Sequence, residues 1–385
     1  MHILHISNSY GGTKVYKNLY TQLDMLGVRQ TIFVPLNYKN RNRVGNQMIV
    51  FKTEGSKIIY STVLKSWHRI FYMAKINAIV RDLKKKVDLH DIDAIHASTQ
   101  CLDGAVAYKL HQKTGIPYVT AVRNTDVNGY YKVFVWRKGF FGKILKKASR
   151  IIFISPQYKN NFLGNILSEP AKAKIEPKVH VIPNGVDPVF LVNKSSGHKT
   201  YEGVLNLIFV AAFYRGKGLL ETLQAIELLR GKGYEITLNA IGKGLPNRPF
   251  DKEYIKQVEE FARGKDWVTL QPFKKPEGII AEMRQANAFI MVSKPETFGL
   301  VYVEALSQHL PIIYGKGEGF DGFYPDGFVG YPAKAGNMED IANKIESLIK
   351  NYDTIAHHVE TLELETDFAW SNIGKKYLSI YMTLQ

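Results

Sequence analysis

Apolar residues in the first half of the chain fall into short runs, separated by longer segments in which they recur every three or four positions. The short runs predict strands at residues 2–6, 30–36, 94–97 and 116–122, with two more inside 148–158 and 178–188. The periodic segments predict helices over residues 15–26, 61–86 and 104–114. Strands that alternate with helices at this spacing favour a parallel, doubly wound sheet.

The second half repeats the same alternation. Its apolar runs predict strands at residues 205–213, 234–242, 267–273, 288–293 and 311–315. Helices are predicted over residues 219–229 and over 371–385 at the end of the chain. Two further helices are predicted between them, one that begins at about residue 251 and one that ends at residue 283. The fold class is therefore α/β, with two similar Rossmann-like halves that we expect to face each other across a cleft.

Length and composition agree with two domains in a reducing compartment. A chain of 385 residues exceeds the size at which one core usually stops growing. The single cysteine, Cys101, has no partner for an internal disulfide, and no apolar run approaches the 18 residues of a membrane-spanning helix. No secretory signal is visible at the N-terminus, so we expect a cytoplasmic protein.

The net charge of +16 is distributed unevenly. Residues 1–187 contain 29 Lys and Arg against 11 Asp and Glu, and the remainder contains 22 against 24. Such an asymmetry indicates that the first half faces a polyanion: an anionic membrane, a nucleic acid or an acidic substrate. The alternative is a set of solvated lysines without a partner.

Residues 132–150 concentrate this basic character. They contain seven Lys or Arg and no acidic residue, interleaved with Phe134, Trp136, Phe140, Phe141 and Ile144. This composition is typical of a helix that lies in a membrane interface. The same aromatic residues also fit a helix that buries them in the core while its lysines face water.

The segment 293–308, SKPETFGLVYVEALSQ, carries two carboxylates between two predicted strands. Glu304 is surrounded by apolar residues, and a buried unpaired charge is costly, so we expect a ligand to use it. Glu296 follows a strand directly. Ligands of such sheets bind at the carboxyl ends of strands, which places Glu296 at the expected site.

Two cations follow the first strand of the second half. Arg215 and Lys217 precede a predicted helix, and together they predict a diphosphate site, because Arg can contact two oxygens and Lys supplies a point charge. Backbone N–H groups at the start of the next helix would bind the same phosphates, and Glu304 would accept hydrogen bonds from ribose hydroxyls. Those N–H groups belong to Phe298, Gly299, Leu300 and Val301.

The first half offers weaker signals at the equivalent places. Gly11 and Gly12 follow the first strand, where glycine leaves backbone N–H groups free for an anion or simply makes a tight turn. Residues 123–126, Arg-Asn-Thr-Asp, form a polar cluster after the strand ending at Val122. A structural Arg–Asp pair and a catalytic group both fit this cluster.

These residues resemble glycosyltransferase family 4, whose members have the GT-B fold. The resemblance rests on the E-x7-E element formed by Glu296 and Glu304, on Lys217-Gly218, and on VIPNGVD before them. GGTKVY and IIFIS are similar to the family's acceptor domain. The resemblance implies an acceptor-binding domain over residues 1–187, a donor-binding domain over 188–370, and a C-terminal helix over 371–385 that packs back on the first.

The resemblance also implies the chemistry. It predicts a retaining hexosyl transfer from a nucleotide diphosphate sugar, UDP-sugar rather than GDP-sugar, to a glycan, glycolipid or polymer of the cell envelope. No metal or other cofactor is expected. Glu296 would lie beside the donor sugar and Glu304 on the ribose, while Arg215 and Lys217 stabilise the leaving diphosphate.

The chain departs from the family pattern at two positions. Ala212 stands where the family often has an arginine, so Arg215 is expected to substitute. The family's histidine after the strand ending at Val122 is absent, and Asn124 and Asp126 are the candidates for the acceptor side. Asp91 and Asp93 form a D-x-D sequence, but they precede a strand, so we interpret them as a turn and not as a metal site.

Two other functions share some of these features. A nucleotide-sugar epimerase has similar halves but no use for a basic lobe. A non-catalytic polyanion-binding protein would use the basic lobe but would leave Glu296 and Glu304 unexplained. The favoured hypothesis is a cytoplasmic enzyme, peripheral on the inner face of the membrane, with no nucleic-acid partner.

Overall fold

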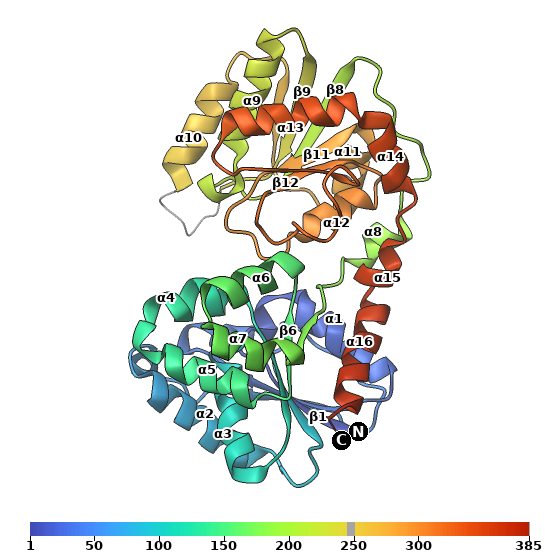
Figure 1. Ribbon diagram of the computed structural model, residues 1–385. Helices are drawn as coiled ribbons and strands as arrows, with labels where there is room; N and C mark the ends of the chain where they lie inside the picture. The colour runs from blue at the N-terminus through green and yellow to red at the C-terminus, as the bar shows by residue number, and fades with distance from the viewer. Residues whose placement is uncertain (245–250, 385) are drawn as a thin grey trace. The chain divides into compact units, whose positions relative to one another are not determined.

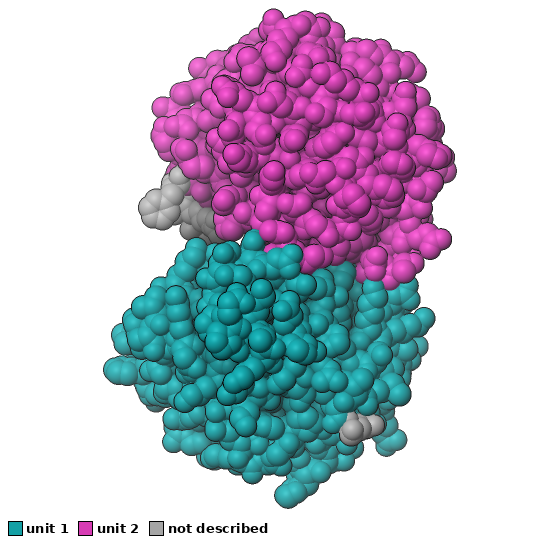
Figure 2. All heavy atoms as spheres, viewed as in Figure 1, with its two compact units in different colours: residues 1–154, 159–185, 370–385 teal, residues 155–158, 186–369 magenta. Residues whose placement is uncertain are grey.

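The computed structural model describes residues 1–244 and 251–384. The chain divides into two compact units, which Figure 2 shows in different colours. Unit 1 comprises residues 1–154, 159–185 and 370–385, and unit 2 comprises residues 155–158 and 186–369. Each unit is built on its own parallel sheet with helices around it (Figure 1). The predicted α/β class with two Rossmann-like domains is confirmed.

The sheet of unit 1 has the strand order β3-β2-β1-β4-β5-β6-β7, and all of its pairs are parallel. Its strands are β1 (His2–Ile6), β2 (Arg29–Pro35), β3 (Lys57–Ser61), β4 (Ala94–Ala97), β5 (Tyr118–Ala121), β6 (Arg150–Phe153) and β7 (Val179–Val181). Every residue of β1, β4 and β5 is buried, as expected for strands covered on both faces. The order reverses between β1 and β4, so this pair marks the switch point of the sheet.

Helices connect these strands and cover both faces of the sheet (Figure 1). The α-helices of unit 1 are α1 (Lys14–Met25), α2 (Tyr72–Lys86), α3 (Asp103–Thr114), α4 (Tyr131–Val133), α5 (Lys138–Lys147), α6 (Pro156–Asn165, whose first turn belongs to unit 2), α7 (Glu169–Ile175) and α16 (Trp370–Met382). Shorter turns are η1 (Tyr10–Gly12), η2 (Tyr38–Arg43), η3 (Ser66–Arg69), η5 (Val135–Arg137) and η6 (Glu176–Lys178), and η4 (Thr125–Tyr130) is a π-helix.

The last helix, α16, belongs to the core of unit 1 although it is last in sequence. Ile373, Tyr377 and Tyr381 are buried in one cluster with Leu19 and Leu23 of α1. The fit is close, because a Cβ on Gly374 would lie 2.8 Å from the Cβ of Gln22. The expectation that the C-terminal helix returns to the N-terminal domain is confirmed. Its predicted last residue, 385, lies outside the described residues.

Unit 2 has the strand order β10-β9-β8-β11-β12-β13, again with parallel pairs. Its strands are β8 (Val204–Val210), β9 (Glu235–Ile241), β10 (Val268–Gln271), β11 (Ala288–Met291), β12 (Ile312–Gly315) and β13 (Gly330–Ala333). Its helices are α8 (Pro188–Val192), η7 (Arg215–Lys217), α9 (Leu219–Gly231), α10 (Asp251–Ala262), α11 (Pro276–Gln285), α12 (Leu300–Leu306), α13 (Met338–Lys350), α14 (Tyr352–Glu360) and α15 (Leu364–Phe368). The switch point lies between β8 and β11.

The prediction of one helix over residues 61–86 is wrong at its start. The chain first completes β3, passes through η3, and begins α2 only at Tyr72. Ile58, Ile59 and Tyr60 suit a strand, and Ile58 pairs with Ile32 of β2. Residues 58–64 contain no Gly, Pro or charged residue, so the sequence carries no clear break between the strand and the predicted start of the helix.

Residues 316–370 received no prediction, yet they contain β13 and three helices. The strand β13 reads GYPA, and both Gly and Pro weaken the strand signal. Gly330 is required there, because its φ is 141° and a Cβ would lie 1.8 Å from the Ile312 oxygen. Helix α13 does carry a readable pattern: Ile341, Ile345 and Leu348 are buried, and Asn337 caps the first turn.

Residues 132–150 divide into buried and exposed apolar side chains, and their contact with a membrane stays a prediction. Helix α5 buries Phe141, Ile144 and Leu145 in the core. The preceding turn instead leaves Trp136 71% exposed, with Val135 also in solvent. Among the described residues no helix is long and apolar enough to span a membrane.

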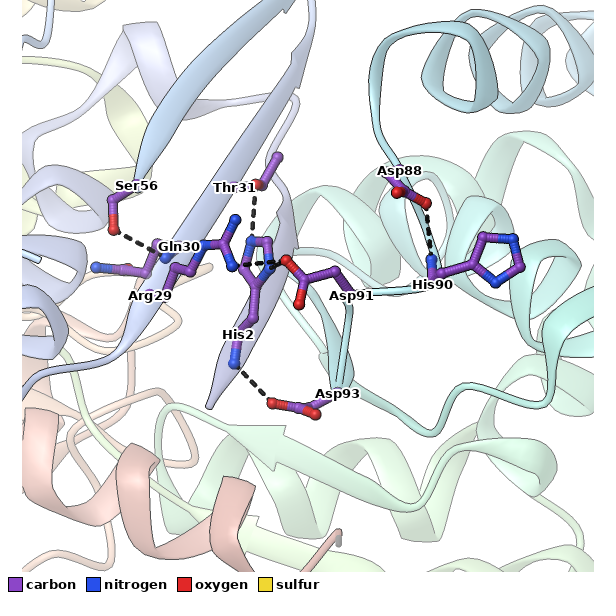
Figure 3. A network of polar contacts seen from close by, with 9 residues as sticks. All are labelled: His2, Arg29, Gln30, Thr31, Ser56, Asp88, His90, Asp91 and Asp93. Atoms are coloured by element: carbon purple, nitrogen blue, oxygen red, sulfur yellow. Dashed lines mark hydrogen bonds and ion pairs between the residues drawn. The ribbon is translucent and has the colours of Figure 1, made fainter. Parts of the chain in front are cut away.

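The acidic pair Asp91 and Asp93 lies at the amino end of β4, as predicted (Figure 3). Asp91 accepts a hydrogen bond from Arg29 Nη1 at 2.6 Å, and its Oδ2 lies 3.3 Å from His2 Nδ1. Asp93 accepts from the backbone N–H of His2 at 2.7 Å. These contacts fasten the starts of β1, β2 and β4 to one another at the amino edge of the sheet.

The position of α16 generates a stability prediction. Replacing Ile373, which is fully buried, by Ala should lower the free energy of unfolding by about 2 to 5 kcal/mol. Ser379→Ala, an exposed change on the same helix, should leave it within about 0.5 kcal/mol of the parent. Urea unfolding monitored by circular dichroism measures both. Equal midpoints for Ile373→Ala and the parent would contradict the role given to α16.

Candidate functional site

The candidate donor site lies at the carboxyl edge of the unit 2 sheet, beside its switch point. Arg215 and Lys217 follow β8, and Glu296 follows β11. These strands are neighbours and parallel, so the two loops leave the sheet on the same side. The sequence therefore placed both groups at the correct edge.

Lys217 and Glu296 form an ion pair between these loops. Lys217 Nζ lies 2.7 Å from Glu296 Oε2, and the side chains are only 16% and 14% exposed. The second oxygen of Glu296 accepts from the backbone N–H of Thr297 at 3.0 Å. Both oxygens of this carboxylate are thus engaged, and the ammonium points toward the edge of the sheet where ligands of such folds bind.

Glycines allow the two loops to come this close. Gly218 has φ 73°, and a Cβ on it would lie 2.5 Å from the Val292 oxygen. A Cβ on Gly216 would lie 3.0 Å from the Lys294 oxygen, and the Lys294 N–H donates to the Gly216 oxygen at 2.8 Å. Without these glycines the backbones would separate, and Lys217 would move away from Glu296.

A third loop, after β12, completes the support of Glu296, and sequence reasoning missed it. Glu318 Oε2 accepts from the backbone N–H of Glu296 at 2.7 Å, and the Gly319 N–H donates to the backbone carbonyl oxygen of Glu296 at 2.9 Å. Burial raises the pKa of Glu318, and the nearby Glu296 carboxylate adds to this. The available signal was KGEGF, a glutamate between glycines directly after a strand.

Glu304 lies in α12 with a partly buried side chain. Within residues 1–244 and 251–384 its carboxylate has no hydrogen-bond or ion-pair partner. Burial raises the pKa of Glu304 from 4.5 to about 7, and the negative charge of Asp187 adds to the shift. The carboxylate is therefore available to a ligand, and the contact of Glu304 with ribose hydroxyls stays a prediction.

The start of α12 differs in part from the predicted phosphate-binding turn. Phe298 is 2% exposed and packs against Phe323 and Phe368, so its side chain belongs to the core. Gly299 has φ 84° and caps the helix, where a Cβ would lie 2.3 Å from the Tyr302 ring. Leu300 and Val301 begin a helix of only seven residues. Their contact with phosphate stays a prediction.

Arg215 is exposed, unlike Lys217. Its guanidinium lies 5.9 Å from the centre of the Tyr254 ring, and the Tyr254 hydroxyl accepts from the Leu220 N–H at 2.9 Å. The side chain is therefore loosely held in one short turn with Lys217. It remains free to turn toward an anion at the same edge.

In unit 1, Gly11 and Gly12 lie in η1 directly after β1. Their lack of side chains makes room for Arg43: a Cβ on Gly12 would lie 2.6 Å from Arg43 Nη1, and one on Gly11 would lie 3.0 Å from the Arg43 oxygen. The pair thus brings a cation to the carboxyl end of β1. Arg43 carried no recognisable sequence signal.

Asp126 has a structural environment. It is fully buried, and its oxygens accept from the backbone N–H groups of Gln100 at 3.1 Å, Cys101 at 2.7 Å and Arg123 at 2.8 Å. Burial raises its pKa while these three donors lower it. This geometry favours a role in joining the loops after β4 and β5 over contact with a substrate. Asn124 is exposed and accepts from Asn128 at 2.6 Å, so its assignment stays a prediction.

Asp103 is a second buried carboxylate at this edge, and the sequence analysis did not select it. It accepts from Asn8 Nδ2 at 2.9 Å and from Thr99 Oγ1 at 3.0 Å. Burial raises its pKa to about 7. Arg123 Nη1 donates to Asn184 at 3.1 Å. These contacts tie the carboxyl ends of β1, β4, β5 and β7 together.

The environment of Glu304 generates a pH prediction. Its folded pKa is raised above the ordinary value, so the folded chain holds a proton that the unfolded chain releases between about pH 4.5 and pH 7. This contribution to stability is present at low pH and is lost as pH rises through that window. At pH 8 the free energy of unfolding of Glu304→Gln should therefore exceed that of the parent by about 1 to 3 kcal/mol, and its melting temperature should be higher. At pH 4 the variant and the parent should be equally stable.

Melting temperatures of the parent and variant from pH 4 to pH 8 measure this difference. Glu259→Gln, at an exposed position of α10, is the matched control and should follow the parent at every pH. A gap between Glu304→Gln and the parent that does not change with pH would contradict the raised pKa.

The chain matches known protein families over nearly its whole length. Residues 10–190 match the family described as Glycosyltransferase Family 4, and residues 193–361 match the family described as Glycosyl transferases group 1. An uncharacterized glycosyltransferase of Methanocaldococcus jannaschii is 25% identical over 83% of this chain and 83% of its own length. The alpha-monoglucosyldiacylglycerol synthase of Acholeplasma laidlawii is 23% identical over 90% of this chain and 84% of its own length.

A solved structure shows the same fold. The chain superposes on an Anabaena protein in complex with UDP and glucose with a TM-score of 0.65 and 17% identity, covering 100% of both chains. The two family matches cover both sheets except β1, and the elements Lys217-Gly218 and Glu296 to Glu304 lie within the second match. The chain belongs to glycosyltransferase family 4 and is a glycosyltransferase.

Proposed function

We propose that this glycosyltransferase is a retaining hexosyltransferase that works without a catalytic metal. Its donor is a nucleotide diphosphate sugar, and we expect a UDP-sugar rather than a GDP-sugar. The observation that carries the proposal is the Lys217–Glu296 ion pair, held at 2.7 Å beside the switch point of the unit 2 sheet. UDP in the Anabaena structure supports the choice of base. The acceptor is a glycan, glycolipid or polymer of the cell envelope.

Lys217 and Arg215 would stabilise the diphosphate as it leaves. Negative charge grows on the diphosphate when the bond between the sugar carbon and the phosphate oxygen breaks, so fixed cations lower the barrier. Lys217 is already oriented by Glu296, and the exposed Arg215 can close on the same oxygens. The departing phosphate oxygen would take the proton of the acceptor hydroxyl, whose oxygen bonds to the sugar carbon on the same face.

The two glutamates would have separate tasks. Glu296 is fixed by Lys217, by its own loop and by Glu318, which suits a group that positions the donor sugar. Glu304 has no protein partner among the described residues, and a pair of ribose hydroxyls would supply donors to it. This assignment also accounts for the cost of keeping a carboxylate partly buried.

We further propose that unit 1 holds the enzyme on the inner face of an anionic membrane. Two segments of unit 1 expose apolar side chains beside one another: Ile70 and Phe71 before α2, and Val133, Val135 and Trp136 around η5. We call these five residues the apolar rim. Basic residues flank the rim, and such a combination favours anionic lipid.

The donor assignment predicts a selective loss of activity. Lys217→Ala should lower kcat for sugar transfer by about 100-fold to 1,000-fold, since it removes a fixed charge from the leaving group. Release of UDP from UDP-sugars in the presence of membrane lipid and glycan acceptors measures this. Lys265→Ala removes another ion-paired lysine of unit 2, the partner of Glu227 at 2.5 Å, and should retain full activity.

Activity of Lys217→Ala equal to that of the Lys265→Ala control would refute the donor site. Conversion of the nucleotide sugar into its epimer, without transfer, would instead indicate the epimerase alternative. Binding of polyanions with no effect of any nucleotide sugar on thermal stability would indicate the non-catalytic alternative.

The apolar rim predicts membrane binding that depends on charge. The protein should sediment with phosphatidylglycerol vesicles and not with phosphatidylcholine vesicles, and high salt should release it. Trp136→Ser should weaken binding by about tenfold, because the exposed indole no longer enters the interface. Met382→Ser, an exposed apolar residue of unit 1 outside the rim, is the control. Equal binding to both kinds of vesicle would contradict the proposal.

A further inference from the structure

Unit 1 contains a pocket of about 330 Å³ that the donor chemistry does not use. Its walls are the start of α2, including Tyr72, and the segment from η4 to α4 with Tyr130, Val133 and Phe134. The aromatic rings contact one another, with Tyr72 and Phe134 centred 5.6 Å apart. These apolar and aromatic side chains resemble the lining of sites for hydrocarbon ligands, and the lining also includes the basic residues His68, Arg69 and Lys75.

Two cations beside the pocket lack the partners that such groups normally have. Lys75 lines the pocket, is partly buried, and has no side-chain hydrogen bond or ion pair in the described part of the chain. Burial lowers its pKa, with only a counteracting effect from Asp103. Arg137 lies 5.3 Å from the centre of the Tyr72 ring, and its buried Nε also has no partner. An anion at this place would satisfy both groups.

The pocket lies at the carboxyl edge of the unit 1 sheet. Thr125, Gly129 and Tyr130 of its lining belong to the π-helix η4, which follows β5. Such helices are rare and often occur at functional sites. The negative charge of Asp103, the first residue of α3 after β4, acts on Lys75 and raises its pKa against the effect of burial. A ligand in the pocket would thus extend from the edge at which α/β folds bind their substrates.

We propose that this pocket binds the hydrocarbon chain of a phosphate-bearing lipid acceptor, with its phosphate at Lys75 and Arg137. The inference rests on the proposed transfer reaction and names its acceptor class. Val133 both lines the pocket and is 60% exposed as part of the apolar rim, so a chain longer than the pocket continues along the rim. A soluble glycan without a phosphate would leave the two cations unpaired.

Binding of single-chain probes tests the pocket directly. Decyl phosphate, below its micelle concentration, should bind in calorimetry, and each methylene gained from octyl to decyl phosphate should tighten binding by about fourfold. Decyl maltoside and inorganic phosphate should each bind at least tenfold more weakly. Lys75→Met should lower the affinity for decyl phosphate about tenfold and leave that for decyl maltoside unchanged. Equal affinities for decyl phosphate and inorganic phosphate would overturn the proposal.

A pair of glycines gives matched variants. Gly129 lines the pocket, and Gly139 lies in α5 away from it; a Cβ at either position would meet nothing within 4 Å, and neither has a positive φ. Gly129→Leu should fill the pocket and abolish decyl phosphate binding, whereas Gly139→Leu should bind it like the parent. A far-UV circular dichroism spectrum and a cooperative thermal transition like those of the parent serve as the check that each variant is folded. Decyl phosphate binding that survives in Gly129→Leu would overturn the assignment.

Transfer of labelled sugar to a total bacterial lipid extract tests whether the lipid bound in the pocket is the acceptor of the reaction or only a membrane lipid. The parent and Gly139→Leu should form labelled product that extracts into organic solvent, and Gly129→Leu should form at least tenfold less. Equal product from Gly129→Leu, or product that stays in water, would overturn the acceptor role. If the parent consumes no nucleotide sugar at all, the proposed function fails, while decyl phosphate binding still decides the pocket.

Discussion

The close approach of the loops after β8 and β11 is the constraint on which the candidate donor site depends. Gly216 and Gly218 let the two backbones touch, and this contact brings the Lys217 ammonium to the Glu296 carboxylate. The topology supplies the place, because the strand order reverses between these strands. A side chain at Gly218 would push against the Val292 carbonyl and would separate the two charges without touching either one.

Buried carboxylates in this molecule divide by what satisfies them. Asp126 accepts from three backbone N–H groups, and Glu296 is held by an ammonium and its own loop. Glu304 has neither kind of partner among the described residues, and burial raises its pKa to about 7. The first kind fixes loops, whereas the last kind would be satisfied by the ribose hydroxyls of the proposed donor. In that proposal the same residue type serves as scaffold and as binding group.

The alternation of apolar runs and helical periodicity was enough to predict the fold class, since both sheets are buried on two faces. It failed where local signals conflict: β3 merges into a basic stretch, and β13 contains Gly and Pro. The meeting of Lys217 and Glu296 at one sheet edge was predictable because both residues follow strands, and Glu304 stood out because it interrupts an apolar helix. Glu318 had only the signal of a glutamate between glycines after a strand, and Arg43 had none, because the positions of both depend on how separate loops pack.

The groups without a protein partner at the two candidate sites carry opposite charges. At the edge of the unit 2 sheet the cation Lys217 is paired with Glu296, and the carboxylate of Glu304 has no partner among the described residues. Beside the unit 1 pocket the carboxylates Asp103 and Asp126 are satisfied by their own loops, whereas Lys75 and the Nε of Arg137 have no partner among the described residues. Desolvating a cation without a partner costs stability, so its retention beside an apolar pocket argues for an anionic amphiphile. The excess positive charge of residues 1–187 would then bind a phosphate at the pocket and also attract the protein to an anionic membrane.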